Sequence, residues 1–142
     1  MILQDLLNSR PTELVSLAPI GTNLLQLLGR IQGPPVTPYE AGIFHVQIPI
    51  PEDFPIAPPA CRFLTKVYHP NIDATGKMCL ECLHTANWRM ELMHLESILI
   101  STSALLDQPG MDDPLVPDIA GTYIQDKATF DHIARQYTFR YA

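Results

Sequence analysis

The chain has 142 residues, of which 46% are hydrophobic and 17% are charged, and its formal net charge is −6. This length and apolar content predict a single folded domain over residues 1–142 and exclude a wholly disordered chain. The acidic balance argues against a nucleic-acid partner, which would require a basic surface. Three cysteines are too few for a disulfide scaffold and no apolar run reaches the roughly 18 residues of a membrane span, so we expect a soluble protein with no membrane partner.

The first part of the chain predicts a short helix followed by a strand. Apolar residues fall on one helical face between Met1 and Ser9, and Pro11 should end that helix. The apolar run Leu24–Ile31 predicts a strand, which the turn residues Gly33-Pro34-Pro35 should close.

Two further strands are predicted in the proline-rich part of the chain. Residues 43–50 alternate, with Phe44, Val46, Ile48 and Ile50 on one face and His45, Gln47 and Pro49 on the other. This period of two is typical of a half-buried strand, and Pro49 predicts a strand end or an edge. Cys61 to Thr65 predicts a third short strand with Cys61 and Phe63 on the same side.

The second half of the chain predicts an irregular segment and then helices. No period holds from Tyr68 to Trp88, and so long a stretch without regular structure is often functional. Helical spacing then returns at Leu92, Leu95, Leu99, Thr102 and Leu106. The order of elements predicts an α+β fold with a small antiparallel sheet.

Two later helices are indicated by residues typical of helix starts. Pro117 is well placed as a first helical residue, and Asp126 can cap a last helix. The apolar stripe of that last helix is predicted to consist of Phe130, Ile133, Ala134, Tyr137 and Tyr141.

Cys79 is the first candidate for chemistry, because it follows the turn Asp73–Gly76 inside the irregular segment. An exposed cysteine with thiolate character is a nucleophile, whereas a buried cysteine is inert packing. Cys79 and Cys82 also form a CxxC, which could belong to a zinc or redox site. Such a zinc site would need two more ligands, for which Cys61, His69 and His84 are available, but the chain has no second CxxC.

Asn71, which lies eight residues before Cys79, and Asp113 are two polar candidates for a role in chemistry. Asn71 follows His69-Pro70, and it is either a turn former or an amide donor to a developing oxyanion. Asp113 lies in Asp112-Asp113-Pro114, which is most simply a solvated turn. Composition does not decide between these interpretations.

Several of these motifs, taken together, resemble the ubiquitin-conjugating enzymes. The resemblance covers essentially the whole chain, and no single motif is decisive. It is carried by ordered markers at the family's spacings, namely Ser16–Gly21, Gly33-Pro34, Pro38-Tyr39, Gly42–Phe44, Phe54-Pro55 with Pro58-Pro59, His69-Pro70-Asn71, Cys79, Trp88 and Asp112–Pro117. It implies an N-terminal helix, a four-stranded antiparallel meander, an active-site segment and C-terminal helices.

The resemblance also implies an activity. Cys79 would accept ubiquitin or a ubiquitin-like modifier as a thioester from an activating enzyme, in an ATP-dependent pathway. It would then transfer the modifier to a substrate lysine, usually with a ligase. Asn71 would stabilise the oxyanion, directly or by holding a loop, and Asp113 would orient and deprotonate the lysine. The alternative is a non-catalytic ubiquitin-binding module of the same fold.

Other positions take their expected roles from the resemblance as well. Supporting residues of the active site would be His69, Leu80, Glu81 and Leu115. A ligase would contact Ile56 and Met90, and Ser16, in a loop ahead of the first strand, would meet a second ubiquitin on the back of the sheet. Cys61 and Cys82 become packing residues, and no metal or cofactor is expected. The implied protein is a monomer of the cytoplasm, the nucleus or both.

Overall fold

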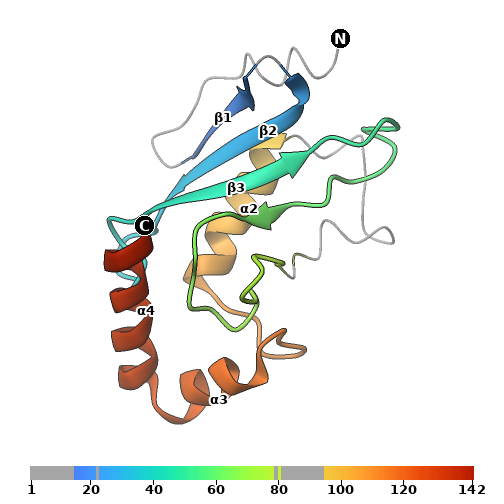
Figure 1. The fold of residues 1–142 in the computed structure, drawn as a ribbon. Helices are drawn as coiled ribbons and strands as arrows, with labels where there is room; N and C mark the ends of the chain where they lie inside the picture. Colours follow the sequence, from blue (N-terminus) through green and yellow to red (C-terminus); the bar gives the residue numbers. More distant parts are fainter. Residues whose placement is uncertain (1–14, 22, 79, 81–94) are drawn as a thin grey trace.

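The computed structural model describes residues 15–21, 23–78, 80 and 95–142, and these residues form an α+β fold. The strands are β1 (Val15–Ile20), β2 (Asn23–Gln32), β3 (Ile43–Pro49) and β4 (Arg62–Phe63). The described helices are α2 (Leu95–Asp107), α3 (Pro117–Gln125) and α4 (Lys127–Tyr141). The helix α2 lies across one face of the sheet, and α3 and α4 lie beyond one end of it (Figure 1). The expected helix at Met1–Ser9 lies outside the described residues.

The four strands form an antiparallel meander in the order β1-β2-β3-β4, which confirms the fold class. Alternate side chains of β3 point into the core, where Phe44, Val46 and Ile48 are fully buried. Gly29 on β2 lets α2 approach closely, because a Cβ at this position would lie 2.6 Å from a methyl carbon of Leu99. The predicted strands at 24–31 and 43–50 are therefore confirmed to within a residue or two at each end. The predicted strand at 61–65 is confirmed but shorter, since β4 spans only Arg62–Phe63.

The prediction of a loop at Ser16–Gly21 is wrong, because this segment belongs mostly to β1. Its backbone pairs with β2, with Ser16 opposite Arg30 and Ala18 opposite Leu28. Only Val15 is buried on this strand, and residues 18–20 are exposed. An edge strand with one solvated end carries no alternating pattern, and such an edge tolerates Pro19.

The helices confirm most of the expected boundaries. Helix α2 contributes Leu95, Leu99, Thr102 and Leu106 to the core, as predicted, while Leu92 lies outside the described residues. Pro117 occupies the first turn of α3. The Asp126 side chain caps α4 by accepting a hydrogen bond from the Thr129 backbone N–H at 3.2 Å.

The predicted apolar stripe of α4 is wrong at its C-terminal end. Phe130 and Ala134 are buried as expected, but Thr138 takes the third buried position. Tyr137 and Tyr141 are exposed by 37% and 42%. The reason is that residues 130, 134 and 138 repeat every four positions along one face. The Thr138 hydroxyl is satisfied there, because it donates to the Ala134 carbonyl at 2.9 Å.

None of the described helices is long and apolar enough to cross a membrane.

Residues 33–42 form a tight loop between β2 and β3. A hydrogen bond joins its ends, because the Gly33 N–H donates to the Gly42 carbonyl at 2.8 Å.

We expect Val36→Asn to stabilise the protein through this loop. Val36 has a φ of 60°, in the left-handed region, and its side chain is 95% exposed. Packing of the branched side chain therefore does not offset the cost of this backbone conformation. That conformation costs a residue with a Cβ about 1–2 kcal/mol, and Asn tolerates it far better than Val. Urea unfolding should therefore show a gain of about 1 kcal/mol. Val36→Ala is the matched control and should gain less, and an equal gain in both variants would contradict the backbone explanation.

Candidate active site

The segment before residue 79 is folded into a tight turn that fixes its course. The Asp73 carboxylate accepts hydrogen bonds from the Thr75 hydroxyl at 2.6 Å, the Thr75 N–H at 2.9 Å and the Lys77 N–H at 3.0 Å. The Thr75 hydroxyl, together with these backbone donors, lowers the pKa of Asp73. Met78 and Leu80 are both buried, while Cys79 itself lies outside the described residues. The chain on both sides of position 79 is thus anchored.

His69 is a buried, neutral side chain that connects this segment to α2. Its Nδ1 accepts the Asn71 backbone N–H at 3.0 Å, so the proton must lie on Nε2, which donates to the Leu105 carbonyl at 2.8 Å. Burial lowers the pKa of His69 from 6.5 to about 4, against the opposing effect of the Leu105 carbonyl. The ring also lies beside that of Tyr39, with centroids 5.9 Å apart. His69 therefore shapes the segment and carries no charge at neutral pH.

The Asn71 amide is committed to the loop after α2 by two hydrogen bonds. Its Nδ2 donates to the Gly110 carbonyl at 2.8 Å, and its Oδ1 accepts the Gly110 N–H at 2.8 Å. Asn71 is almost completely buried. The amide thus binds one backbone unit of the loop with both of its polar atoms.

The same loop is attached to the site at its other end. The Val116 N–H donates to the Pro70 carbonyl at 3.0 Å, so residues 110–116 are held at two points by residues 70 and 71. Asp112 and Asp113 are exposed between these two attachments, and Leu115 is half-buried. The structure therefore attaches the loop that carries Asp113 and Leu115 to residues 70 and 71, next to His69. Leu80 is buried, and no direct contact joins it to this loop among the hydrogen bonds of the described residues.

The other predicted site residues lie elsewhere or outside the described part of the chain. Ser16 is half-buried on β1, at the opposite edge of the sheet from β4, and Ile56 is 70% exposed in the turn region after β3. Glu81 and Met90 are outside the described residues.

Two residues that hold the site together were missed by sequence reasoning. Gly110 supplies both partners of the Asn71 amide, although it is 39 residues away along the chain. Tyr39 is buried against His69, and its hydroxyl donates to the Tyr68 carbonyl at 2.6 Å. No local pattern marks either contact, because each joins distant parts of the chain.

The described residues contain no group of three or more metal-ligating side chains. Cys61, one of the candidate zinc ligands, is buried beside β4 as expected for a packing residue. Cys82 and His84 lie outside the described residues.

The buried state of His69 predicts a loss of stability in mild acid. Its pKa is about 4 when folded and 6.5 when unfolded, so the unfolded chain binds the extra proton between these values. The contribution of neutral His69 to the free energy of unfolding is fully present above pH 6.5. It falls as the pH drops towards 4, by about 3 kcal/mol in total. Protonation of Nδ1 would also displace the Asn71 N–H. Urea unfolding from pH 7 to 4.5 measures this loss.

Histidine NMR provides the control for that titration. The His69 ring should titrate near pH 4, whereas the exposed His132 serves as the reference ring in the same spectrum. A His69 ring that titrates at or above 6.5 would contradict the assignment of the pH effect to this residue.

Comparison with known proteins agrees with this fold. The family model for "Ubiquitin-conjugating enzyme" matches residues 2–138. The structure is similar to the E2 domain of a ubiquitin-conjugating enzyme from Toxoplasma gondii, with 34% identity, a TM-score of 0.92, and coverage of 99% of this chain and 96% of that one. It is also similar to a candidate ubiquitin-conjugating enzyme from Plasmodium yoelii, with 35% identity, a TM-score of 0.91, and coverage of 99% and 92%. The chain therefore belongs to the ubiquitin-conjugating enzyme family.

Proposed function

We propose that this chain accepts ubiquitin or a ubiquitin-like modifier as a thioester on Cys79 and transfers it to a lysine amine of a substrate. The observation that supports this proposal is the double attachment of the 110–116 loop to Pro70 and Asn71. It fixes the segment that carries the exposed Asp113 to the buried Asn71 amide, and the next residue, Ile72, pairs with Met78 beside position 79.

Loading begins with the Cys79 thiolate. Its sulfur attacks the carbonyl carbon of the thioester that joins the modifier to the activating enzyme, and the sulfur of the activating enzyme leaves as a thiolate. One thioester is exchanged for another, so the step needs no external oxidant or reductant. A cysteine thiol has an ordinary pKa of about 8.5, which leaves a usable thiolate fraction at neutral pH.

Discharge transfers the modifier from sulfur to nitrogen. A neutral lysine amine attacks the thioester carbonyl, negative charge builds on the carbonyl oxygen, and the carbon–sulfur bond then breaks to release the Cys79 thiolate. Asp113 would orient the amine and take up its proton. Asn71 would act on the same step, either by holding the loop that carries Asp113 or with the second N–H of its Nδ2, since Gly110 takes one N–H and the Oδ1 of the amide.

The partners follow from this role. We propose that a ligase contacts the exposed Ile56 together with Met90, and that Ser16 on β1 lies in a second contact surface for ubiquitin at the far edge of the sheet. The proposed site of action is the cytoplasm, the nucleus or both. These assignments describe a carrier that works between an activating enzyme and a ligase.

An adduct assay tests the proposal. The protein is incubated with ATP, an activating enzyme and a panel of modifiers, each with its own activating enzyme, and is examined by electrophoresis with and without a thiol reductant. We expect an adduct with at least one modifier that the reductant removes. A protein that binds ubiquitin but forms no such adduct with any modifier would instead be a non-catalytic binding module.

A further inference from the structure

The C-terminal end of α4 carries exposed aromatic side chains in place of the polar ones expected on a solvated helix. Tyr137 and Tyr141 are each more than a third exposed, and their rings meet edge to face with centroids 5.6 Å apart. Tyr137 also touches the ring of Tyr68, at 5.6 Å between centroids. Exposed apolar surface that gathers in one place marks interaction sites more often than scattered single residues do.

Two cations share one of these rings. The Lys66 ammonium lies 5.1 Å from the centroid of the Tyr141 ring, and the Arg140 guanidinium lies 5.7 Å from the same centroid. Lys66 comes from the segment after β4, which runs beside α4 (Figure 1). Within the described part of the chain the ion pair formed is Lys127 with Asp131, so neither Lys66 nor Arg140 is neutralised by a carboxylate there. We call Lys66, Tyr137, Arg140 and Tyr141 the α4 surface.

This concentration of positive charge contrasts with the chain as a whole, whose formal net charge is −6. Two like charges held against one ring repel each other, and an anion placed between them removes that repulsion. The aromatic contacts also hold both cations in place before a partner arrives, which lowers the entropic cost of binding. The α4 surface is therefore complementary to carboxylate groups.

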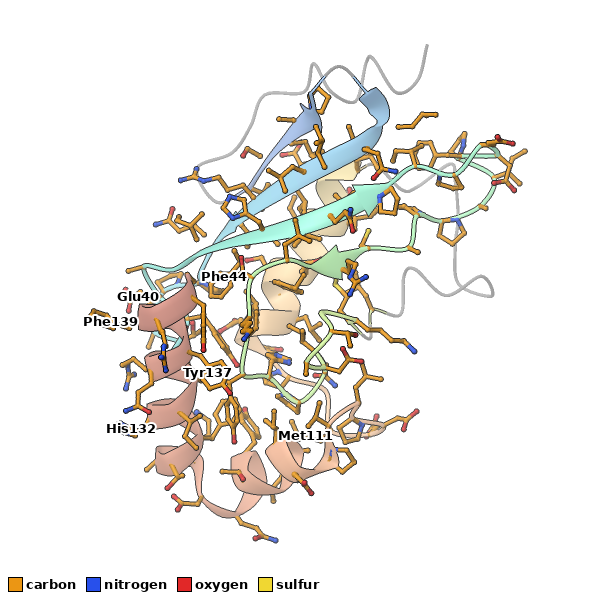
Figure 2. All side chains as sticks on the ribbon, in the orientation of Figure 1. Glu40, Phe44, Met111, His132, Tyr137 and Phe139 are labelled. Carbon is orange, nitrogen blue, oxygen red and sulfur yellow. The ribbon has the colours of Figure 1, made fainter. Side chains whose placement is uncertain are left out.

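A groove of about 420 Å³ adjoins this surface and supplies an apolar subsite. Tyr137 and Lys66 belong to its lining, and Val67, Tyr68 and Ile119 are among its apolar neighbours. In the side-chain view Tyr137 points from α4 towards the interior of this region, whereas Phe139 points away from it (Figure 2). A ligand that bridges cations and groove needs carboxylates next to an apolar or aromatic side chain.

We propose that the α4 surface docks an acidic segment of a partner protein, with its carboxylates on Lys66 and Arg140 and an aromatic or aliphatic side chain in the groove beside Tyr137. A nucleic acid fits less well. Nucleobases bind such proteins by stacking on open ring faces, and here the two cations and the Tyr137 ring already surround Tyr141. The groove reaches the Asp73–Gly76 turn and Val116 of the candidate active site, but binding at the α4 surface forms no thioester and requires no loaded modifier.

The test uses random polymers of known composition, because their sequences contain carboxylates and aromatic rings at every local spacing. The intact protein is titrated into a labelled random Glu/Tyr copolymer, and binding is followed by fluorescence anisotropy and by backbone NMR shifts. We expect binding with shifts concentrated at residues 66–68 and 137–141, weaker binding to poly-Glu and to Lys/Tyr copolymer, and a loss of affinity as salt is raised. A Glu/Tyr copolymer that does not bind, or that shifts other residues, overturns the proposal.

Charge-reversal variants distinguish the effect of the α4 surface on binding from the effect of the overall net charge of the protein. Lys66→Glu with Arg140→Glu should weaken copolymer binding about tenfold or more, since two charge contacts are replaced by repulsion. The matched control is Arg30→Glu with Lys77→Glu, which has the same net charge and should bind as the parent does. Equal losses in both double variants would overturn the proposal.

Two further results would also overturn it. Tighter binding of a 15-nucleotide oligothymidylate than of the Glu/Tyr copolymer would make this a nucleic-acid surface. Unchanged copolymer binding together with a lower melting temperature in Lys66→Glu/Arg140→Glu would mean that the cations only stabilise the C-terminal end of α4 through its helix dipole. Because neither readout involves a thioester, failure here leaves the adduct assay unaffected.

Discussion

Cys79→Ala should abolish the reductant-sensitive adduct completely, whereas Cys61→Ala should retain it. The reason is accessibility to a partner as large as an activating enzyme. Cys61 is buried against β4, where its sulfur is 3.9 Å from the Pro59 carbonyl, and it cannot reach a second protein without local unfolding. Position 79 follows a turn in which residues 74 and 75 are exposed to solvent.

Cys82→Ala serves as the matched control for Cys79→Ala, because the two cysteines are three residues apart and the substitution is the same. We expect the Cys82→Ala protein to load at the parental rate. Cys79→Ser adds a positive test, since an oxygen ester at this position would survive the reductant but be removed by alkali. An adduct that persists in Cys79→Ala, or disappears only in Cys82→Ala, would assign the modifier to another residue.

The sheet could be predicted where one face of a strand is fully buried. In β3 the side chains of Phe44, Val46 and Ile48 all enter the core, so the alternation is visible in the sequence alone. The edge strand β1 was missed because it is held mainly by backbone pairing with β2, and backbone hydrogen bonds leave no mark on side-chain pattern. Fold class was therefore predictable, whereas this edge was not.

The last helix shows a different limit of pattern reasoning. The stripe predicted for this helix includes Tyr137 and Tyr141 and omits Thr138, because it follows the most apolar side chains at helical spacing. In the structure the Thr138 hydroxyl bonds within its own helix, which makes the residue acceptable in the core, and the two tyrosines become surface. That surface is the one proposed above to bind an acidic partner.

The contacts of the candidate active site could not have been derived from the sequence. The sequence motifs indicate Asn71 and Asp113 as polar residues of interest, but they leave open whether the Asn71 amide contacts an oxyanion or holds a loop. The hydrogen-bond partner of the Asn71 amide, Gly110, is 39 residues away and has no functional side chain. Only the fold shows that the asparagine and the loop are bound to each other.

Asn71→Ala should slow transfer of the modifier to lysine about a hundredfold while changing the rate of loading much less. A polar contact that acts in the aminolysis transition state is worth about 3 kcal/mol, which is the basis of this figure. The substitution also leaves the Gly110 N–H and carbonyl without their partner, so we expect the protein to lose about 2 kcal/mol of stability, at about 1 kcal/mol per hydrogen bond. Single-turnover discharge of the purified thioester to free lysine measures the first effect, and urea unfolding measures the second. Equal losses in loading and discharge would mean a general structural role.

Gly110 offers a way to separate the loop from the oxyanion. Gly110→Pro removes the N–H that Asn71 accepts but leaves the amide side chain in place. Gly110→Ala keeps that N–H, and its added Cβ would lie at an ordinary 3.9 Å from the Asn71 amide. If Asn71 works by holding the loop, Gly110→Pro should slow discharge and Gly110→Ala should not. If the amide acts on the oxyanion itself, both variants should discharge at the parental rate.

A double-mutant cycle then connects the loop to Asp113. Asp113 lies between Gly110 and Val116, the two points at which this loop is attached to residues 70 and 71. If Asn71 serves to place that carboxylate, then Asp113→Ala should slow discharge strongly in the parent and only slightly in the Asn71→Ala protein. Coupling of this kind between residues that share one loop is usually about 0.5–3 kcal/mol, whereas independent effects add. Fully additive losses would separate the two residues and return the asparagine to a role of its own at the carbonyl oxygen.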